Sequence, residues 1–281
     1  KCILRKSTKK LTRPRLSNPR MLGFWISFFC IGFFVASAAY LIARELKLMA
    51  IVDTIWTAGL GLSALVYHTV AELESIRSWA VLLIIFLWSF RLSFHLFKDR
   101  VFAGHEDPRY KALAEHWGIQ SDRNFFFLFL AQIVFIALFL FPVSIAMQNP
   151  QQVWAWTDTL AVLIGISAML GEWIADRQLA NFRSNPDNKG CVCQDNLWRY
   201  TRHPNYFFEW LHWFAYLAFA VGSSSVWFAL VGPIAMFIFL RFLTGVPYAE
   251  MSSLKSRGEA YHRYQSSTNA FFPWIPRNKT A

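Results

Sequence analysis

Long apolar runs with few charges recur along this chain, and they constrain its fold more than any other feature. A helix needs about 20 apolar residues to cross the hydrocarbon core of a bilayer. By that measure the sequence predicts about seven spans: 21–43, 49–70, 78–97, 124–147, 153–174, 206–222 and 226–246. The fifth and sixth are weaker, because Asp158 and Glu209 interrupt them. We therefore expect an all-α fold, a polytopic membrane bundle of about seven transmembrane helices with an amphipathic C-terminal tail.

The charge of the chain supports the same class. Only 16% of the residues are charged, whereas a soluble domain has about 25%. The formal net charge of +11 is one that a nucleic-acid-binding protein could share. Here, however, the basic residues lie between apolar runs, so anionic lipid headgroups or a phosphorylated ligand are better partners. We expect contact with membrane lipids and none with nucleic acid, and the sequence does not indicate an oligomeric state.

Loop length and loop charge predict how the spans are oriented. The segments 98–123 and 176–203, after the third and fifth spans, are long and charged, and the polar tail continues this pattern. With seven spans these three segments share one face, which the positive-inside rule makes cytoplasmic. We expect a multi-pass integral protein of a bacterial inner membrane or an endoplasmic-reticulum-like membrane, with its site facing the cytoplasm.

The N-terminal segment does not fit this orientation. Residues 1–20 carry eight Lys and Arg and no acid, yet seven spans put them on the opposite face. Three explanations stay open: a targeting arm, a natural start at Met21, or one miscounted span. We treat 1–20 as a basic arm that is either targeting or non-native, and 21–281 as a single membrane domain, because no repeat is visible and the linkers are short.

Several common types of site are missing from the sequence. Cys191 and Cys193 have no second cysteine pair that would complete a four-ligand metal site, so we predict no metal. There is no glycine-rich dinucleotide fingerprint after a strand, no phosphate-binding loop and no His-Glu-x-x-His motif. Any nucleotide must therefore be held by a helical membrane site.

Ionisable residues inside the predicted spans are candidates for chemistry, because placing a charge in a membrane is costly. Asp53, in the second span, is either functional or an acid that complements the dipole near a helix start. Arg91 and His95, in the third span, are four residues apart and so share one helical face. Snorkelling to the interface explains Arg91 alone, whereas the pair favours a cavity lining. We treat all three as candidate catalytic residues.

The end of the fifth span carries an acid and a base at a helical spacing. Asp176 and Arg183 are seven residues apart, so they face the same way, about 10 Å from each other at about 1.5 Å per residue. That spacing suits an extended polar ligand, and the alternative is a solvated helix end.

The segment 197–214 brings positive charge to the start of an aromatic helix. Pro204 suits the first turn of the sixth span, where its missing N–H costs nothing, and the free N–H groups there favour an anion. Asn205 and Glu209 are four apart and face one groove. Phosphate outside and a polar, non-ionic group deeper in are the expected contacts; the alternative is a basic cluster that holds lipid headgroups. The basic residues just upstream are Arg199, Arg202 and His203.

The tail gives a second signal. Steps of four, three, four and three place five of its residues on one stripe of a helix. The stripe is too polar for a core and too aromatic for a plain solvated face, so we expect one wall of a site whose other wall is the segment 199–209. Its members are Glu250, Leu254, Arg257, Tyr261 and Tyr264.

Together these motifs resemble a known family. The stretches that carry the resemblance are LWRYTRHPNYFFEW, ADRQLANFRSNPDNKG, HEDPRYKAL and LKSRGEAYHRYQSSTNAFFPWIP. Over roughly residues 45–276 the chain resembles the bacterial and plant membrane proteins grouped with steroid 5α-reductases. RHPNY alone is less specific, because it also occurs in sterol C14- and C7-reductases, and a similar pattern occurs in isoprenylcysteine carboxyl methyltransferases.

The resemblance implies a seven-helix bundle that holds NADPH in a cavity open to the cytoplasm. It implies a reaction of lipid metabolism like that of a 3-oxo-5α-steroid 4-dehydrogenase, in which a double bond conjugated to a ketone is reduced. Hydride passes from the nicotinamide to the β-carbon, while a polar group stabilises the charge that develops on the ketone oxygen. The cofactor supplies the hydride and the protein supplies position and field.

The resemblance also assigns residues to the cofactor. Asp176 and Arg183 match the acid and base that hold the adenosine and phosphate part. Asn205 and Glu209 match the Asn and Glu near the nicotinamide, which makes Glu209 a candidate catalytic residue as well. The other expected cofactor contacts are Arg199, Arg202, His203, Arg257, Tyr261 and Tyr264.

The substrate end departs from the animal steroid reductases, which bind the ketone with a Glu on the second helix and a Tyr on the third. Neither residue has a clear match in this chain. Asp53 or Glu72 could replace the Glu, and Arg91 or His95 could replace the Tyr. Steroid as the substrate is therefore less well supported than reduction itself.

Two other classes compete with an NADPH-dependent ene-reductase that acts on a steroid-like or other lipid. An S-adenosylmethionine-dependent membrane methyltransferase of the isoprenylcysteine carboxyl methyltransferase type usually has adjacent glutamates ahead of the tail helix, whereas Glu250 stands alone here. A non-enzymatic lipid-binding membrane protein would not need polar residues aimed into one groove. We therefore predict an oxidoreductase with NADPH as its cofactor and a lipid-like small molecule as its substrate.

Overall fold

The computed structural model describes residues 19–104 and 106–277, and all regular secondary structure in those residues is helical. The long helices are α1 (Pro19–Leu46), α2 (Ile51–Val70), α3 (Ile76–Leu96), α5 (Ser121–Met147), α6 (Trp156–Ser184) and α8 (Pro204–Ala220). The last bundle segment runs through η5 (Val226–Leu230), α9 (Val231–Ile238), η6 (Phe239–Leu243) and α10 (Val246–Arg257). The shorter elements are η2 (Phe97–Phe102), α4 (Pro108–Trp117), η3 (Gly118–Gln120), η4 (Pro186–Asn188), α7 (Leu197–Tyr200) and α11 (Glu259–Ser267).

Each predicted span is helical over most of its length, so the all-α class is confirmed. Within the described residues, five helical runs are long and apolar enough to cross a membrane: Pro19–Leu46, Ile76–Phe102, Pro108–Met147, Trp156–Ser184 and Val226–Arg257. Neither α2, with 20 residues, nor α8, with 17 residues, is among these five. The fold is a polytopic helical bundle of the kind that integral membrane proteins use. Most of the basic arm 1–20 lies outside the described residues, and its last two residues begin α1.

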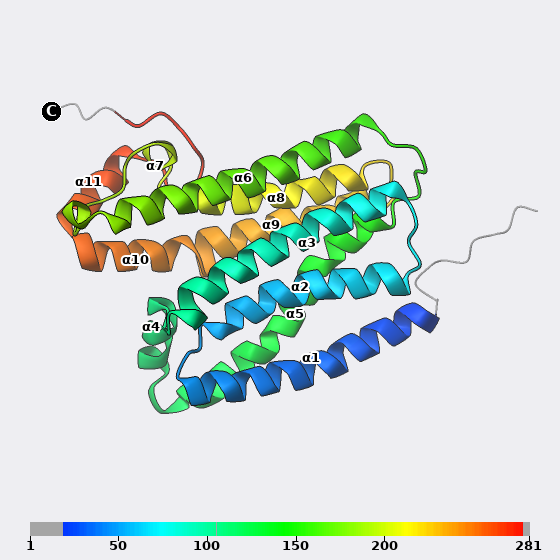
Figure 1. Ribbon diagram of the computed structural model, residues 1–281, viewed down its shortest axis with the longest axis horizontal. Coiled ribbons are helices and arrows are strands. Elements are labelled where there is room, and N and C mark those ends of the chain that lie inside the picture. The colour runs from blue at the N-terminus through cyan, green and yellow to red at the C-terminus, as the bar shows by residue number, and fades with distance from the viewer. Residues whose placement is uncertain (1–18, 105, 278–281) are drawn as a thin grey trace, which may run out of the picture.

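The long helices run alternately up and down the bundle, so loops that are distant in sequence meet at the same end. Figure 1 shows η2, α4, α7, α10 and α11 together at one end, and the N-terminus of α1 at the other. The segments that the sequence marks as charged therefore share one face, as expected. Which side of the membrane this face occupies stays a prediction from the positive-inside rule.

The most extensive contact between two helices joins α6 to α8, and small residues make it possible. A Cβ atom added to Gly171 would lie 2.4 Å from the ring of Phe208, so the two backbones approach there more closely than a side chain allows. Ala168 and Ala175 are fully buried on the same helix. Small residues allow this approach between membrane helices, and the contact fixes how the side chains of α6 and α8 face one another.

A layer of aromatic side chains fills the middle of the bundle. The Trp88 ring stacks on the His212 ring with centroids 5.4 Å apart and meets the Trp56 ring edge-on at 5.9 Å. The layer is closed to solvent: its fully buried members are Trp88, Phe139, Trp213, Tyr216 and Phe219. Such rings bury large apolar areas, and their edge-to-face geometry adds to the packing energy. This layer separates the two polar ends of the bundle.

At the end opposite the charged loops, a buried ion pair explains the acid that interrupts the fifth span. Arg77 donates from Nε to Oδ1 of Asp158 at 2.6 Å and from Nη2 to Oδ2 at 2.7 Å. The same guanidinium donates to the backbone carbonyl oxygens of Gln151 and Val153. Arg77 and Asp158 are 2% and 0% exposed, so the pair must be fully hydrogen-bonded to be tolerated. Asp158 therefore joins α3 to α6 and lies outside the candidate site.

Candidate functional site

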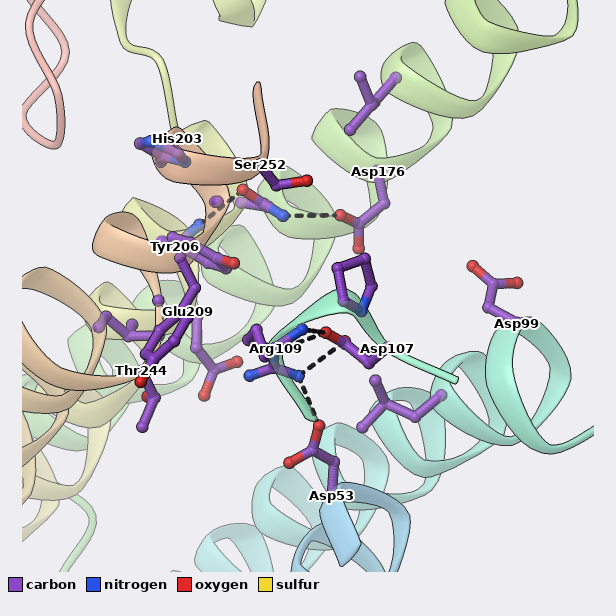
Figure 2. A pocket seen from close by; sticks show the side chains of 18 of the residues that line it. Asp53, Asp99, Asp107, Arg109, Asp176, His203, Tyr206, Glu209, Thr244 and Ser252 are labelled. Atoms are coloured by element: carbon purple, nitrogen blue, oxygen red, sulfur yellow. Dashed lines mark hydrogen bonds and ion pairs between the residues drawn. The ribbon is translucent and has the colours of Figure 1, made fainter. Parts of the chain in front are cut away.

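A cavity of about 900 Å³ lies at the end of the bundle where the charged loops meet. Its lining comes from every helix of the bundle except α1, and from α4, α10 and α11 as well. Figure 2 shows carboxyl groups from three helices around this space: Asp53 of α2, Asp176 of α6 and Glu209 of α8. Residues more than 150 positions apart thus contribute to one site, in keeping with the location expected from the sequence.

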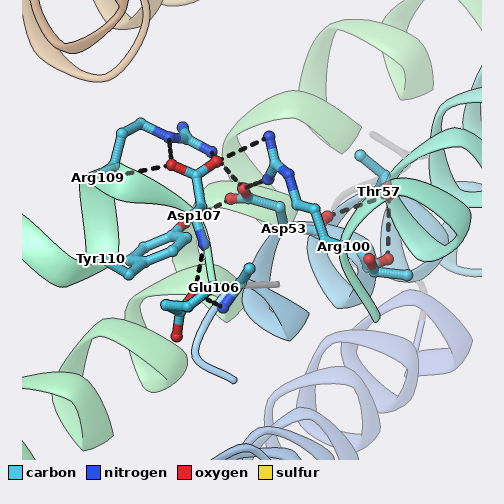
Figure 3. A network of polar contacts seen from close by, with 9 residues as sticks. Asp53, Thr57, Arg100, Glu106, Asp107, Arg109 and Tyr110 are labelled. Atoms are coloured by element: carbon cyan, nitrogen blue, oxygen red, sulfur yellow. Dashed lines mark hydrogen bonds and ion pairs between the residues drawn. The ribbon is translucent and has the colours of Figure 1, made fainter. Parts of the chain in front are cut away.

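Asp53 lines the cavity, but other side chains already satisfy its carboxylate (Figure 3). It accepts hydrogen bonds from Arg109 Nη2 at 2.7 Å and from the Tyr110 hydroxyl at 2.7 Å, and Arg100 donates a third. Asp107 pairs with the same two arginines, at 3.1 Å from Arg100 and 3.0 Å from Arg109. The negative charges of the two aspartates therefore balance the positive charges of the two arginines. This network ties α2 to α4 and leaves Asp53 little capacity to bind a substrate.

The residues flanking this network hold the chain in place as well. The Glu106 carboxylate accepts the backbone N–H groups of Ala50 and Asp107 at 3.0 and 2.9 Å, which caps the start of α2 and fixes the turn before α4. Burial raises the pKa of Asp107, but the hydrogen bonds and charge of Arg109 outweigh it and hold that pKa below its ordinary value. The stretch EDPRY, residues 106–110, therefore holds the chain in place at the rim of the cavity.

A second group of acids, with fewer partners, lines the cavity where it meets the aromatic layer. Arg91 of α3 forms an ion pair with Glu172 and lies 3.8 Å from Asp176. Glu209 accepts a hydrogen bond at Oε2 from Trp88 Nε1 at 2.8 Å. Its other oxygen, Oε1, is buried with no hydrogen-bond partner in the described part of the chain. Arg91 itself is not among the lining residues, so it acts through the acids it holds.

Asp176 and Arg183, the acid and base predicted to bracket a ligand, both line the cavity. Asn205 Nδ2 donates to Asp176 Oδ1 at 3.2 Å, which links α8 to α6. Arg183 makes no hydrogen bond or ion pair with any residue that the structure describes. The charges of Arg183 and Arg257 act on each other, and Arg257 donates only to the Cys191 carbonyl and the Ser256 hydroxyl. Two guanidinium groups without an acid partner therefore face the cavity, as an anion site requires.

Arg202 and His203 line the cavity, but their polar groups serve the fold. The Arg202 Nε group donates to Glu250 at 2.7 Å, and Nη1 donates to the carbonyl oxygens of Gln265 and Thr268. His203 Nε2 lies 3.3 Å from the same glutamate. Burial lowers the pKa of His203, and this effect exceeds the opposing one from Glu250. These contacts anchor the tail to the start of α8, and they leave Arg202 with few donors for a phosphate.

Arg199 lies on the exposed side of α7 and is not among the lining residues, so the structure does not bring it to the cavity. Tyr261 and Tyr264 are buried and line it. The Tyr264 hydroxyl donates to the backbone carbonyl oxygens of Trp198 and Thr201, so it is not free to bind a ligand. Burial, together with the charge of Glu250, raises the pKa of Tyr261 to about 12, so its hydroxyl stays protonated at neutral pH.

The single helical stripe predicted for the tail is wrong. α10 ends at Arg257 and α11 begins at Glu259, because Gly258 between them has a φ of +49°, a value that favours glycine. Glu250 and Leu254 are absent from the lining, while Arg257 and the two tyrosines remain in it. The tail still forms one wall of the cavity, but with a different face of α10.

Four residues were expected as replacements for the family's ketone-binding pair; Asp53 and Arg91 are described above, and His95 and Glu72 differ in outcome. His95 lines the cavity at its rim, 3.6 Å from Asp99. Glu72 is wrong as a site residue, because it lies just after α2 at the opposite end of the bundle. There it pairs with Arg20 at the start of α1. Asp53 lies in the first turn of α2, a 20-residue helix, whereas Glu72 follows its last turn.

A family model described as "Protein of unknown function (DUF1295)" matches residues 39–268 of the chain. The chain belongs to the DUF1295 family. A relative from Schizosaccharomyces pombe, described as "Uncharacterized protein C594.04c", is 24% identical over 289 residues, which is 92% of this chain and 80% of the relative. No solved structure matches the chain. The matched DUF1295 range contains all the candidate residues described above.

Three groups of lining residues in this DUF1295 chain were not predicted as site residues from the sequence. Trp56 lines the cavity, and its Nε1–H is buried without a hydrogen-bond partner among the described residues. Glu172, one turn before Asp176, is 5% exposed; its spacing from Asp176 was a usable signal. The wall that α10 contributes includes Tyr248, Ser252 and Ser256, which are four residues apart and so share one helical face, with Ser253 beside them.

Proposed function

We propose that the protein is an NADPH-dependent membrane oxidoreductase that reduces a carbon–carbon double bond conjugated to a ketone in a lipid-like substrate. The main support is that two parts of the cavity wall offer different chemical groups. Arg183 and Arg257 carry positive charge without an acid partner among the described residues, whereas Glu209 and Trp56 bring buried polar atoms to the aromatic layer. The free guanidinium groups suit the phosphates of a cofactor. The buried polar atoms suit chemistry on a carbonyl compound.

The size of the cavity agrees with this use. Its volume of about 900 Å³ is near the top of the range of roughly 300–1,000 Å³ typical of small-molecule sites. A cofactor that shares a site with its substrate requires such a volume. The lining also includes apolar residues of α5 and α9, among them Phe135, Phe139 and Met236, which suit a lipid-like substrate.

The resemblance to the steroid 5α-reductase group gives the proposed orientation of the cofactor. Arg183 and Asp176 would hold the adenosine and phosphate part, with Arg257 as a second phosphate contact. Asn205 and Glu209 would lie at the nicotinamide end. Arg199 is not part of this proposal because it does not line the cavity, and Arg202 contributes mainly by fixing the tail.

The substrate carbonyl needs a hydrogen-bond donor that no protein group already uses. Asp53 is saturated by its three donors, whereas the Trp56 indole N–H has no acceptor among the described residues. We therefore assign Trp56 to the ketone oxygen. Bound NADPH supplies the hydride, and the indole N–H would stabilise the negative charge that then develops on that oxygen.

One observation favours a second candidate. Three acids, Glu172, Asp176 and Glu209, surround the single guanidinium of Arg91, so this part of the wall is rich in negative charge. A sulfonium cation would be attracted to such a wall. An S-adenosylmethionine-dependent methyltransferase is therefore the alternative, and simple lipid binding without chemistry is the third possible outcome.

Ligand binding by the purified protein in detergent separates these three functions. We expect NADPH to raise the unfolding temperature, since a ligand at 100 times its Kd stabilises a protein by about 2.7 kcal/mol. NADH should act more weakly and S-adenosylmethionine should not act at all. Stabilisation by S-adenosylmethionine alone would overturn the proposal in favour of the methyltransferase, and no shift with any of the three would favour lipid binding.

Two matched variants locate the cofactor. Arg183→Ala should weaken NADPH binding by about 10–100-fold, as expected from the loss of about 1.5–3 kcal/mol for hydrogen bonds to a charged group. Arg177→Ala is the control, because Arg177 lies on the same helix but stacks on Trp173, at 5.2 Å, and does not line the cavity. Oxidation of NADPH in the presence of a 3-oxo-4-ene steroid then tests the reaction itself.

A further inference from the structure

Glu172 and Glu209 form a pair of buried carboxyl groups that share too little positive charge. They are 5% and 6% exposed, and they come from α6 and α8, the two helices in the most extensive contact. Each acts on the charge of the other. Arg91 pairs with Glu172 but also serves Asp176 at 3.8 Å, so one guanidinium faces three acids.

Two such carboxyl groups cannot both carry a full charge at low cost. Like charges in a buried site repel more strongly than in water, because the effective dielectric constant there is about 20 rather than about 80. Close carboxyl pairs relieve this repulsion when one of them keeps its proton. Burial favours the protonated form as well, and Arg91 is the cation that the described residues bring to the pair.

The hydrogen bonds leave room for that proton. Glu209 accepts at Oε2 from the Trp88 indole at 2.8 Å, while its Oε1 is buried without a partner in the described residues. Glu172 differs, because its Oε2 is occupied by the ion pair with Arg91. A buried polar atom normally has a partner. A proton between the two carboxyl groups, or between Glu209 and a bound molecule, would supply it.

Other titratable groups around the pair are less well placed to hold a proton for the cavity. His212 lies one turn further along α8 and bonds the Tyr216 hydroxyl at 2.7 Å; neither residue lines the cavity. Asp176 is already held by Asn205. His95 acts on Asp176 from the rim. Glu172 and Glu209 both line the cavity, so a proton on either can reach a molecule bound in it.

We propose that Glu172 and Glu209 hold one proton between them and deliver it to the substrate during its reduction. The inference rests on the proposed function. In the proposed reduction, NADPH would supply a hydride that bonds to the β-carbon of the substrate, and the former π electrons would become those of an enolate. The α-carbon then takes the shared proton, which restores the ketone and leaves both carboxyl groups ionised. Solvent replaces the proton through the polar rim at Asp176 and His95. One hydride and one proton are consumed in each turnover.

Infrared difference spectroscopy tests the shared proton without substrate or cofactor. At about pH 7 the wild type in detergent should show the C=O band of a protonated carboxyl group, and this band should shift in D₂O. Glu172→Gln and Glu209→Gln should each remove it, because the acid that remains can ionise beside Arg91. Glu115→Gln, a change at an exposed acid of α4, should leave it intact. Absence of the band in the wild type, or its persistence in both site variants, overturns the shared proton.

Kinetics tests the delivery step. With NADPH and a 3-oxo-4-ene steroid, Glu172→Gln should lower kcat by about 100-fold or more, the usual size of a general-acid contribution. Its Kd for NADPH should stay within about threefold of the wild type, and the high-pH limb of the kcat profile, where the wild-type pair loses its proton, should change. An unchanged kcat contradicts delivery. If the wild type fails to reduce the enone, the proposed function and delivery fail together, while the infrared band still decides whether the pair holds a proton.

Discussion

Two clusters of acids and arginines face the same cavity, and they differ in how completely their charges are matched. In the first, which we call the closed network, Asp53 and Asp107 balance Arg100 and Arg109, and every carboxylate oxygen that the ion pairs involve has a donor. In the second, which we call the open cluster, three acids gather around Arg91: Glu172, Asp176 and Glu209. The closed network contains Asp53, which the sequence offers as a candidate catalytic residue, yet it holds helices together.

The difference shows what a buried charge in a membrane protein indicates. The cost of burial marks an ionisable residue as important, but a structural ion pair and a reactive group share that cost. The two kinds of residue differ in whether hydrogen-bond donors already occupy all the oxygens of the carboxylate. Asp53 has three donors, whereas Glu209 has an oxygen with none in the described residues. The open cluster therefore has capacity for a ligand or a proton, and the closed network does not.

Breaking the closed network should have the largest effect on stability. Asp53→Ala leaves Arg100 and Arg109 with an excess of positive charge. We expect a loss of about 3 kcal/mol in the free energy of unfolding, the low end of the range for breaking a buried ion pair, because 25% of the Asp53 side chain is exposed. Denaturant unfolding in detergent measures it. Asp53→Asn, which keeps some hydrogen bonds, should lose less; a loss below about 1 kcal/mol in both would contradict a structural role.

Removing the cation of the open cluster should have a smaller effect that a second change can repair. Arg91→Met leaves Glu172 without its ion pair, and we expect a loss of about 2 kcal/mol, less than for a fully matched pair because the remaining acids can take up protons. The double variant Arg91→Met with Glu172→Gln should recover more than half of this loss. Equal losses in the single and double variants would show that the two residues do not act on each other.

A third cluster, around His203, should produce a pH dependence of about 1 kcal/mol. The pKa of His203 is lowered from 6.5 in the folded protein, by burial against the opposing effect of Glu250. As the pH falls through about 6.5, the unfolded chain binds a proton that the folded chain does not. Stability therefore falls below that pH until the folded pKa is reached. Comparing unfolding free energies at about pH 7.5 and pH 5.5 in the wild type and in His203→Gln isolates this effect; parallel curves would show that His203 does not cause it.

The sequence predicts the bundle well, because apolar length and loop charge are local properties that the bilayer constrains strongly. It also places Asp176, Arg183, Asn205 and Glu209 at one cavity, since helical spacing and the proline-started helix determine the directions they face. The helical stripe of the tail was wrong because one glycine, Gly258, takes a left-handed conformation and divides the helix.

Long-range partners explain the remaining differences. Nothing near Asp53 in the sequence shows that Arg109, 56 residues away, saturates it. Arg202 looks like a phosphate contact until its bonds to the tail are known. Trp56 looks like an ordinary core residue, and only the three-dimensional packing leaves its N–H without a partner. Roles that depend on which donors are already used cannot be predicted from spacing alone.

The smallest expected effect is the sharpest test of the comparison between the two clusters. Glu172→Gln replaces a 5%-exposed acid, and removing such a group normally destabilises a protein. Here the change keeps the shape and puts an amide N–H donor where the shared proton was, but it weakens the pair with Arg91. These opposing contributions should leave the free energy of unfolding within about 1 kcal/mol of the wild type, even though the reaction slows. A loss as large as that of Asp53→Ala would mean that Glu172 is structural and that the open cluster, like the closed network, exists to join helices.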